Sequence, residues 1–181
     1  MDSLTQATLG AAIGEACLGR QIGNRAAFYG AVIATLPDLD VFLPMGGPVA
    51  DFTYHRSFSH SIFVLTAITP MLAMAVQRFR DDPPELRTRW LWLTFLALVT
   101  HSLLDAFTVY GTQLLWPFSN HPFGWASMFI IDPLYTLPML FGVLAALIMT
   151  RETPRGHLIN TAALSLSTAY LGWTLVANAY A

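Results

Sequence analysis

The chain has 181 residues, of which 55% are hydrophobic and only 11% are charged. Soluble domains carry about 25% charged residues, and one soluble core could not bury this much apolar surface. The net charge of −2 argues against a nucleic-acid partner, because no basic patch exists to neutralise phosphates. The composition therefore predicts an integral membrane protein, with the lipid bilayer as its main partner.

Six hydrophobic segments follow one another along the chain, at about residues 4–18, 26–43, 58–79, 90–107, 128–149 and 158–179. A helix needs roughly 20 apolar residues to cross a bilayer, so the last four segments are long enough and the first is marginal. We therefore predict an all-α fold, a polytopic transmembrane helical bundle of about six helices. The bundle is expected to form a single domain over residues 1–181.

The basic residues predict the orientation of this bundle. All nine are arginines, and eight of them lie in the loops after the first, third and fifth segments. Arginine-rich loops of membrane proteins face the cytoplasm. We therefore expect a multi-pass protein of a bacterial inner membrane. Both termini and the loops at 44–57 and 108–127 would lie on the extracytoplasmic side.

Acidic and histidine side chains gather at the predicted extracytoplasmic ends of these segments. Ionisable groups in a membrane are costly unless they are paired or bind an ion, and they are functional candidates by default. The six residues that we expect to meet as metal ligands are Asp38, Asp40, His55, His60, His101 and Asp105.

Imidazole nitrogens and carboxylate oxygens are ligands that suit a divalent metal ion. Zinc accepts both, and its catalytic sites keep one position open for a water molecule. Manganese or iron would accept the same ligands. We therefore predict a divalent cofactor, with zinc preferred, and six ligands leave room for more than one ion.

Each pair of candidate ligands also has a purely structural interpretation. His101 and Asp105 are four residues apart and share one helix face, so a hydrogen bond between them could serve only helix packing. Asp38 and Asp40 follow Pro37, where aspartates commonly terminate a helix or cap a loop. His55 and His60 could be polar packing residues at the interface. The convergence of several segments on one membrane face favours the metal site.

Two further residues are candidates for a catalytic role. Arg56 is the only basic residue of the predicted extracytoplasmic loops, and it could bind an anionic group such as phosphate. Its alternatives are lipid head groups or a salt bridge to Asp51. Asp132 precedes Pro133, a pattern typical of a helix N-cap followed by proline at the first helical position. Its functional alternative is a ligand, or a partner of a ligating histidine.

An apolar stretch at residues 111–118 follows the fourth segment, although it lies in a predicted loop. We hypothesise that it lies in the membrane interface and closes over the site, where a lipid substrate would enter.

Several motifs resemble one known family. They are Met1–Gln6, Leu36–Asp40, His55–Ser61, His101–Asp105, Gly111–Pro117 and Ile131–Tyr135, and together they cover most of residues 1–140. The chain resembles the YdjM-like family of membrane-bound, predicted metal-dependent hydrolases, which is distantly similar to zinc-dependent phospholipase C and P1-type nucleases. The resemblance implies an all-helical fold, several zinc ions and phosphoester hydrolysis, with the same six residues as ligands. Gln6 stands where some relatives have a histidine.

Three functions are consistent with these features. The first is a metal-dependent hydrolase acting on a phosphoester, with a phospholipid as one candidate substrate, at the extracytoplasmic face. The second is a non-enzymatic metal-binding or regulatory membrane protein, in which ions join the helices. The third is a transporter of metal ions or protons. We rank the transporter last, because the inner halves of segments 58–79, 128–149 and 158–179 are almost free of polar side chains.

Overall fold

The computed structural model describes residues 1–44, 46–47, 56–149 and 154–180. Every regular element in these ranges is helical, as the sequence predicts, apart from one isolated bridge between Thr112 and Phe123. The α-helices are α1 (Ser3–Ile22), α2 (Arg25–Thr35), α4 (Ile62–Phe79), α5 (Arg87–Ala106), α6 (Pro133–Met149) and α7 (Arg155–Tyr180). Short 3-10 helices are η1 (Pro37–Phe42), η2 (Phe58–His60) and η3 (Pro84–Leu86).

Local chemistry sets several helix boundaries. The Asp2 side chain accepts a hydrogen bond from the backbone N–H of Thr5 and caps α1, and the Ser61 side chain caps α4 in the same way. Pro37 has no N–H group with which to continue the helical hydrogen-bond pattern, and the α-helical part of the predicted segment 26–43 ends at Thr35, just upstream of it. The remainder is the 3-10 helix η1. The predicted segment 128–149 becomes helical only at Pro133, directly after Asp132.

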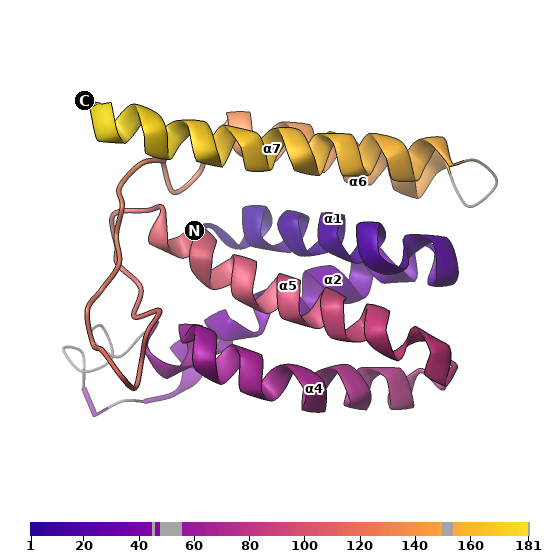
Figure 1. Cartoon of the computed structure of the whole chain (residues 1–181), viewed down its shortest axis with the longest axis horizontal. Coiled ribbons are helices and arrows are strands. Elements are labelled where there is room, and N and C mark those ends of the chain that lie inside the picture. The colour runs from indigo at the N-terminus through magenta and orange to yellow at the C-terminus, as the bar shows by residue number, and fades with distance from the viewer. Residues whose placement is uncertain (45, 48–55, 150–153, 181) are drawn as a thin grey trace.

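The longer helices run side by side along the longest axis of the molecule (Figure 1). Both termini lie at one end of this bundle, and the long connection between α5 and α6 lies at the same end. Hydrogen bonds fix this connection against the start of α4. Gln113 N–H donates to the Arg56 carbonyl, and Ile62 N–H donates to the Leu114 carbonyl. The connection therefore folds back onto residues 56–62, and the location of residues 111–118 in the membrane interface stays a prediction.

Helices α1 and α2 pack with their backbones in direct contact. A Cβ atom added to Gly10 would lie 2.3 Å from the Gly30 carbonyl oxygen, and one added to Gly30 would lie 2.0 Å from the Gly10 carbonyl oxygen. Gly14 approaches the Ala26 carbonyl equally closely. Gly10 and Gly14 form the G-x-x-x-G spacing that lets helices approach in a membrane. The sequence contains this signal, which predicts the close contact of α1 with a neighbour.

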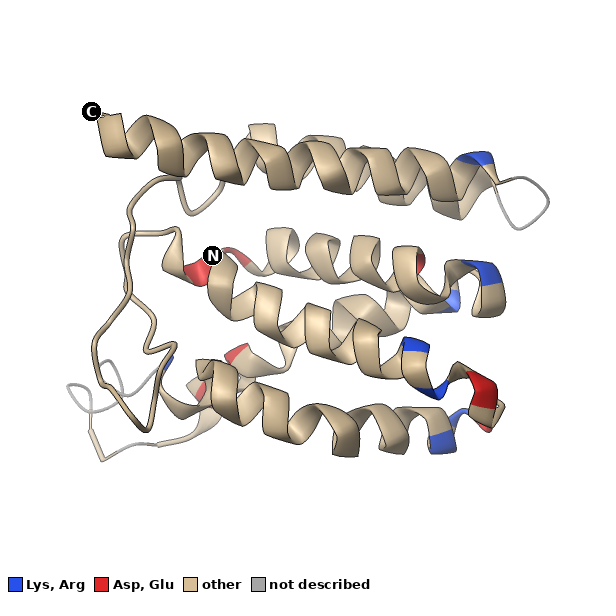
Figure 2. Cartoon of the chain, viewed as in Figure 1, with Lys and Arg blue, Asp and Glu red and all other residues tan. Residues whose placement is uncertain are grey.

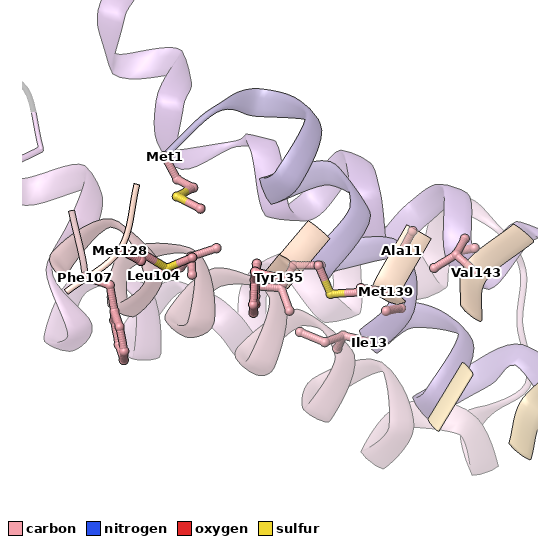
Figure 3. Close-up of a cluster of buried hydrophobic side chains, with 12 residues drawn as sticks. Met1, Ala11, Ile13, Leu104, Phe107, Met128, Tyr135, Met139 and Val143 are labelled. Carbon is pink, nitrogen blue, oxygen red and sulfur yellow. The ribbon is translucent and has the colours of Figure 1, made fainter. Parts of the chain in front are cut away.

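Two groups of buried apolar side chains lie on either side of α1. The first joins α1, α5 and α6 and extends along the bundle through Ile13, Leu104, Tyr135 and Met139 (Figure 3). The second joins α1, α2, α4 and α5 around Trp90, Leu93 and Leu98. Helices α1 and α5 contribute to both groups. The last two turns of α5, which carry two of the predicted ligands, are therefore held rigidly.

The charges are arranged unevenly along the bundle. Arg20, Arg25, Arg78, Arg87 and Arg155 lie in the first or last turns of their helices. Figure 2 shows basic residues concentrated at the end opposite the two termini, together with some acidic residues. The orientation of these two ends relative to the membrane stays a prediction.

The lengths and compositions of the helices support only part of the predicted set of transmembrane spans. Within the described ranges, α4 is the one helix that is long and apolar enough to cross a membrane, and α6 is apolar but shorter, at 17 residues. With 11 residues, α2 is about 16 Å long and cannot cross a bilayer of roughly 30 Å. Helices α1 and α5 bury polar side chains, which lowers their mean hydropathy.

Candidate metal centre

Three segments of the chain bring four of the predicted ligands together. Asp38 lies in η1, directly after α2, and His60 is the last residue of η2, just before α4. His101 and Asp105 lie in the last two turns of α5, on the same helix face. One ligand atom from each of these four residues lies within 4.8 Å of the others.

The separations between these ligand atoms are short and similar. His60 Nε2 is 3.2 Å from His101 Nε2, 3.2 Å from Asp105 Oδ2 and 3.6 Å from Asp38 Oδ1. His101 Nε2 is 3.3 Å from Asp38 Oδ1 and 3.8 Å from Asp105 Oδ2. The two imidazoles therefore present the same ring nitrogen to a space that is shared with two carboxylates.

These distances fit a single tetrahedral ion. Zinc binds nitrogen and oxygen at about 2.0–2.1 Å, so neighbouring ligand atoms of a regular tetrahedron are about 3.3–3.4 Å apart. The five separations given above lie close to this value. Asp105 Oδ2 is also buried and accepts no well-formed hydrogen bond from the described residues. A carboxylate oxygen in that state is expensive unless a cation compensates it, so the donor set suits a divalent metal ion.

Burial differs among the four ligands. His60, His101 and Asp105 are completely buried, whereas the Asp38 side chain retains 27% of its exposure. Solvent therefore reaches the group from the side of η1. Burial opposes ionisation of Asp38, but the His101 and His60 imidazoles beside it hold the pKa of its carboxyl well below the usual range. Burial likewise opposes protonation of His60, but the Asp105 and Asp38 carboxylates that face its ring raise the pKa of its imidazole.

The two oxygens of Asp105 have different partners. Oδ1 accepts a hydrogen bond of 3.2 Å from the Gln6 side-chain amide and also contacts the amino group of Met1. Oδ2 faces the two histidines. Gln6 donates to the His101 carbonyl as well, at 3.3 Å. One oxygen thus anchors the carboxylate against α1, which leaves the other oriented toward the metal position. Gln6, which stands where some relatives have a histidine, therefore lies beside the site and orients Asp105.

Arg56 lies beside the group, as the sequence predicts. Its Nε atom is 3.5 Å from Asp105 Oδ2, and its guanidinium lies over the ring of Tyr110 at 5.3 Å. Nε and Nη1 are buried and have no hydrogen-bond acceptor among the described residues. The backbone of Arg56 has a φ of 65°, a strained conformation for a residue with a long side chain. These unpaired donors could bind an anion next to the ligands.

The remaining predicted residues have other positions. Asp40 is not among the four converging residues; its Oδ2 atom is 3.9 Å from His60 Nδ1 and accepts a hydrogen bond from the Arg56 backbone. His55 lies outside the described residues. Asp132 accepts hydrogen bonds from the backbone N–H groups of Leu134 and Tyr135, so it is the helix N-cap considered as its alternative. Its catalytic role stays a prediction.

Ser59 is a residue of the site that was not predicted from the sequence. Its hydroxyl lies between Asp40 and His60 and is hydrogen-bonded to both. The only sequence signal is its position next to a predicted ligand. Serine directly before histidine is too common a pattern to predict this contact, which depends on how η1 and η2 pack together.

Comparison with known proteins assigns the chain to a family. The model of the family described as "YdjM inner membrane protein" matches residues 1–181, the whole chain. The chain belongs to this family. The resemblance seen in the sequence motifs is thereby confirmed, and with it the assignment to an inner membrane. No solved structure is significantly similar to the chain.

Two relatives of this YdjM family member have names that state no activity. The chain is 34% identical over 139 residues to "Uncharacterized protein YfhP" of Bacillus subtilis, which covers 73% of the chain and 41% of that relative. It is 36% identical over 115 residues to "Inner membrane protein YbcI" of Escherichia coli, which covers 59% of the chain and 65% of that relative. The matched regions thus span less than two thirds of either relative.

Proposed function

We propose that this member of the YdjM family is a membrane-bound, metal-dependent hydrolase that acts on a phosphoester at the extracytoplasmic face. The observation that carries the proposal is the convergence of Asp38, His60, His101 and Asp105, with the unpaired guanidinium donors of Arg56 beside them. A metal ligand set alone would indicate only binding. A neighbouring guanidinium group with unpaired N–H donors adds a binding position for the negative charge of the substrate.

Each residue has a defined role in this proposal. The four converging side chains would hold the ion, which when bound supplies Lewis acidity to activate water and to stabilise negative charge. Gln6 keeps Asp105 Oδ2 directed toward the ligands by binding Oδ1. Arg56 donates hydrogen bonds to the phosphoryl oxygens, where charge increases during the reaction. Its distance of 3.5 Å from Asp105 Oδ2 places these donors next to the ion position.

Exposed apolar side chains near the site support a phospholipid as the substrate. Leu39, Val41 and Phe42 of η1 are 52%, 66% and 79% exposed, and they flank the acidic residues of that element. Val109 and Phe118 of the α5–α6 connection are 68% and 79% exposed. Such side chains favour contact with lipid at the depth of the head groups, where a phosphodiester lies. The enzyme would therefore meet its substrate without extracting it from the bilayer.

The distribution of basic residues supports the proposed orientation of the site. The basic residues at the opposite end of the bundle favour a cytoplasmic location for that end. The metal ligands, both termini and the α5–α6 connection would then lie outside. Arg56 would be the basic residue retained on that side for its function.

A metal-binding protein without catalysis is the second candidate. It is favoured by the complete burial of His60, His101 and Asp105, which would let an ion join η2 to α5. Metal binding without catalysis needs neither a solvent-exposed ligand nor an arginine whose donors have no acceptor. The partial exposure of Asp38 and the free donors of Arg56 favour hydrolysis instead.

The deciding experiment uses the full chain purified in detergent and returned to phospholipid vesicles. Metal content and release of phosphate-containing products from the vesicles are measured for the wild type, Arg56→Ala and His101→Ala. Hydrolysis by the wild type, with metal retained but turnover reduced in Arg56→Ala, supports the enzyme. Metal binding without turnover on phospholipids or on a soluble phosphodiester would leave the second candidate. Absence of metal binding by the wild type would overturn both.

A further inference from the structure

The Ser59 hydroxyl connects Asp40 to the metal ligand His60. Ser59 Oγ donates to Asp40 Oδ2 at 2.5 Å and lies 2.9 Å from Nδ1 of the His60 ring. Asp40 and His60 are themselves 3.9 Å apart between Oδ2 and Nδ1, too far for a direct hydrogen bond. The serine therefore bridges an aspartate of η1 and a histidine of η2.

Counting protons along this bridge fixes the tautomer of His60. An ionised carboxylate has no proton to donate, so the single hydroxyl proton of Ser59 is directed to Asp40. The serine then has only lone pairs to offer the ring, and Nδ1 of His60 must carry the proton of that hydrogen bond. Nε2 is consequently the ring nitrogen that can give up its proton to bind a metal ion. Nε2 is the atom that faces Asp38, His101 and Asp105.

The same oxygen of Asp40 also fixes the backbone of Arg56. Asp40 Oδ2 accepts a hydrogen bond of 3.1 Å from the Arg56 N–H, while the Arg56 carbonyl accepts one from Gln113. Both backbone groups of this residue are thus bound, which holds its φ of 65°. Asp40 therefore links the orientation of a ligand to the position of the anion-binding side chain.

The other histidine lacks this arrangement. His101 Nδ1 is buried and has no hydrogen-bond partner among the described residues. His101 is instead oriented by its place in α5, a regular helix. His60 lies in a three-residue 3-10 helix, which restrains a side chain less, so it depends more on a hydrogen bond to its far nitrogen.

We propose that Asp40 and Ser59 are positioning residues that keep a proton on Nδ1 of His60, so that Nε2 is the ring nitrogen that binds the metal ion. Asp40 is thereby assigned a different role from the ligand that the sequence predicts. The inference rests on the proposed function insofar as Nε2 binds metal, but the tautomer itself is independent of it.

The first test measures the tautomer directly. Nitrogen-15 NMR of histidine-labelled, metal-free protein in detergent shows whether Nδ1 of His60 carries a proton. We expect the Nδ1-protonated form in the wild type and in Ser59→Thr, which keeps the hydroxyl. A mixture dominated by the commoner Nε2-protonated form is expected in Ser59→Ala. A wild type in which Nδ1 of His60 carries no proton would overturn the proposal whether or not the protein binds metal.

The second test measures zinc affinity in the same variants. Loss of a hydrogen-bond partner of a ligating histidine typically costs about ten- to hundredfold in metal affinity. We expect a loss of this size in Ser59→Ala and in Asp40→Ala, with recovery in Ser59→Thr. The double variant should lose no more than the larger single loss, because both changes break one bridge. Ser102→Ala is the control, since its buried hydroxyl has no partner among the described residues.

The two proposals fail in different ways. Unchanged zinc affinity and an unchanged His60 spectrum in Ser59→Ala would overturn the positioning role and leave the hydrolase proposal intact. A wild type that binds no zinc would overturn the hydrolase proposal, while the NMR comparison would still decide the tautomer. If Ser59→Ala is misfolded, the Asp40→Ala and Ser59→Thr spectra answer the same question.

Discussion

The Nε2 atoms of His60 and His101 lie 3.2 Å apart, although 41 residues separate the two histidines in the chain. Two ring nitrogens cannot both carry a proton at this distance without bringing two N–H groups against each other. With a carboxylate oxygen on either side, their lone pairs instead form a ligand set for one cation.

Replacing His101 by alanine should abolish metal binding. We expect the wild type to bind about one equivalent of zinc per chain, and His101→Ala to lose most of it, because three ligands with one flexible aspartate bind poorly. Inductively coupled plasma mass spectrometry of purified protein gives the stoichiometry. His121→Ala is the matched control, since that histidine is exposed in the α5–α6 connection. Equal zinc content in His101→Ala and His121→Ala would contradict the site.

Chelation should lower the thermal stability of the metal-loaded protein. A ligand that binds only the folded state at 100 times its Kd stabilises that state by about 2.7 kcal/mol. Removing the ion also leaves the Asp38 and Asp105 carboxylates within 4.8 Å of each other, with the charge of Arg56 and of the Met1 amino group only on the Asp105 side. The Tm in detergent, with and without chelator, measures the effect. His60→Ala should show no response to the chelator, and a response equal to that of the wild type would place the metal elsewhere.

Replacing Arg56 by alanine should reduce catalysis more than metal binding. Loss of a donor to the charge of a transition state commonly costs about 10²–10³ in kcat. Zinc content should change little, because Arg56 contacts Asp105 only at 3.5 Å and is not a ligand. Turnover of a phosphodiester and metal content are measured on the same preparation. Arg20→Ala, an exposed arginine at the far end of α1, should behave as the wild type.

Replacing Gly30 by alanine should destabilise the bundle. The added methyl group would lie 2.0 Å from the Gly10 carbonyl oxygen, so α1 and α2 would have to separate. Overpacking of this kind costs about 1–3 kcal/mol. Gly172→Ala is the control, because a Cβ there meets nothing within 4 Å and alanine favours the helix. A Tm of Gly30→Ala at or above that of Gly172→Ala would show that α1 and α2 do not pack this way.

The orientation of the bundle can be tested by cysteine labelling. Single cysteines at Ser119 and Arg87, in a Cys17→Ser background, mark the two ends. In intact spheroplasts, a membrane-impermeant maleimide should label Ser119→Cys, and should label Arg87→Cys only after lysis. The reverse pattern would place the metal ligands on the cytoplasmic side.

Much of this protein can be predicted from its sequence, because composition and local chemistry act over short distances. The apolar segments predict the helices, and Pro37, Ser61 and Pro133 occur where helices end or begin. The i, i+4 spacing of His101 and Asp105 predicts that one helix face carries both. Hydropathy was less reliable as a predictor of which segments cross the membrane, because α2, the α-helical part of segment 26–43, is too short to do so.

Only the tertiary structure decided which predicted ligands meet. Asp38 and Asp40 are two residues apart, and the sequence gives no reason to prefer either as a ligand. The packing of η1 against η2 and α5 directs Asp38 to the two Nε2 atoms and Asp40 to Ser59. Side-chain direction in such short irregular elements depends on contacts with distant segments. Local sequence cannot encode those contacts, because they form only when the bundle closes.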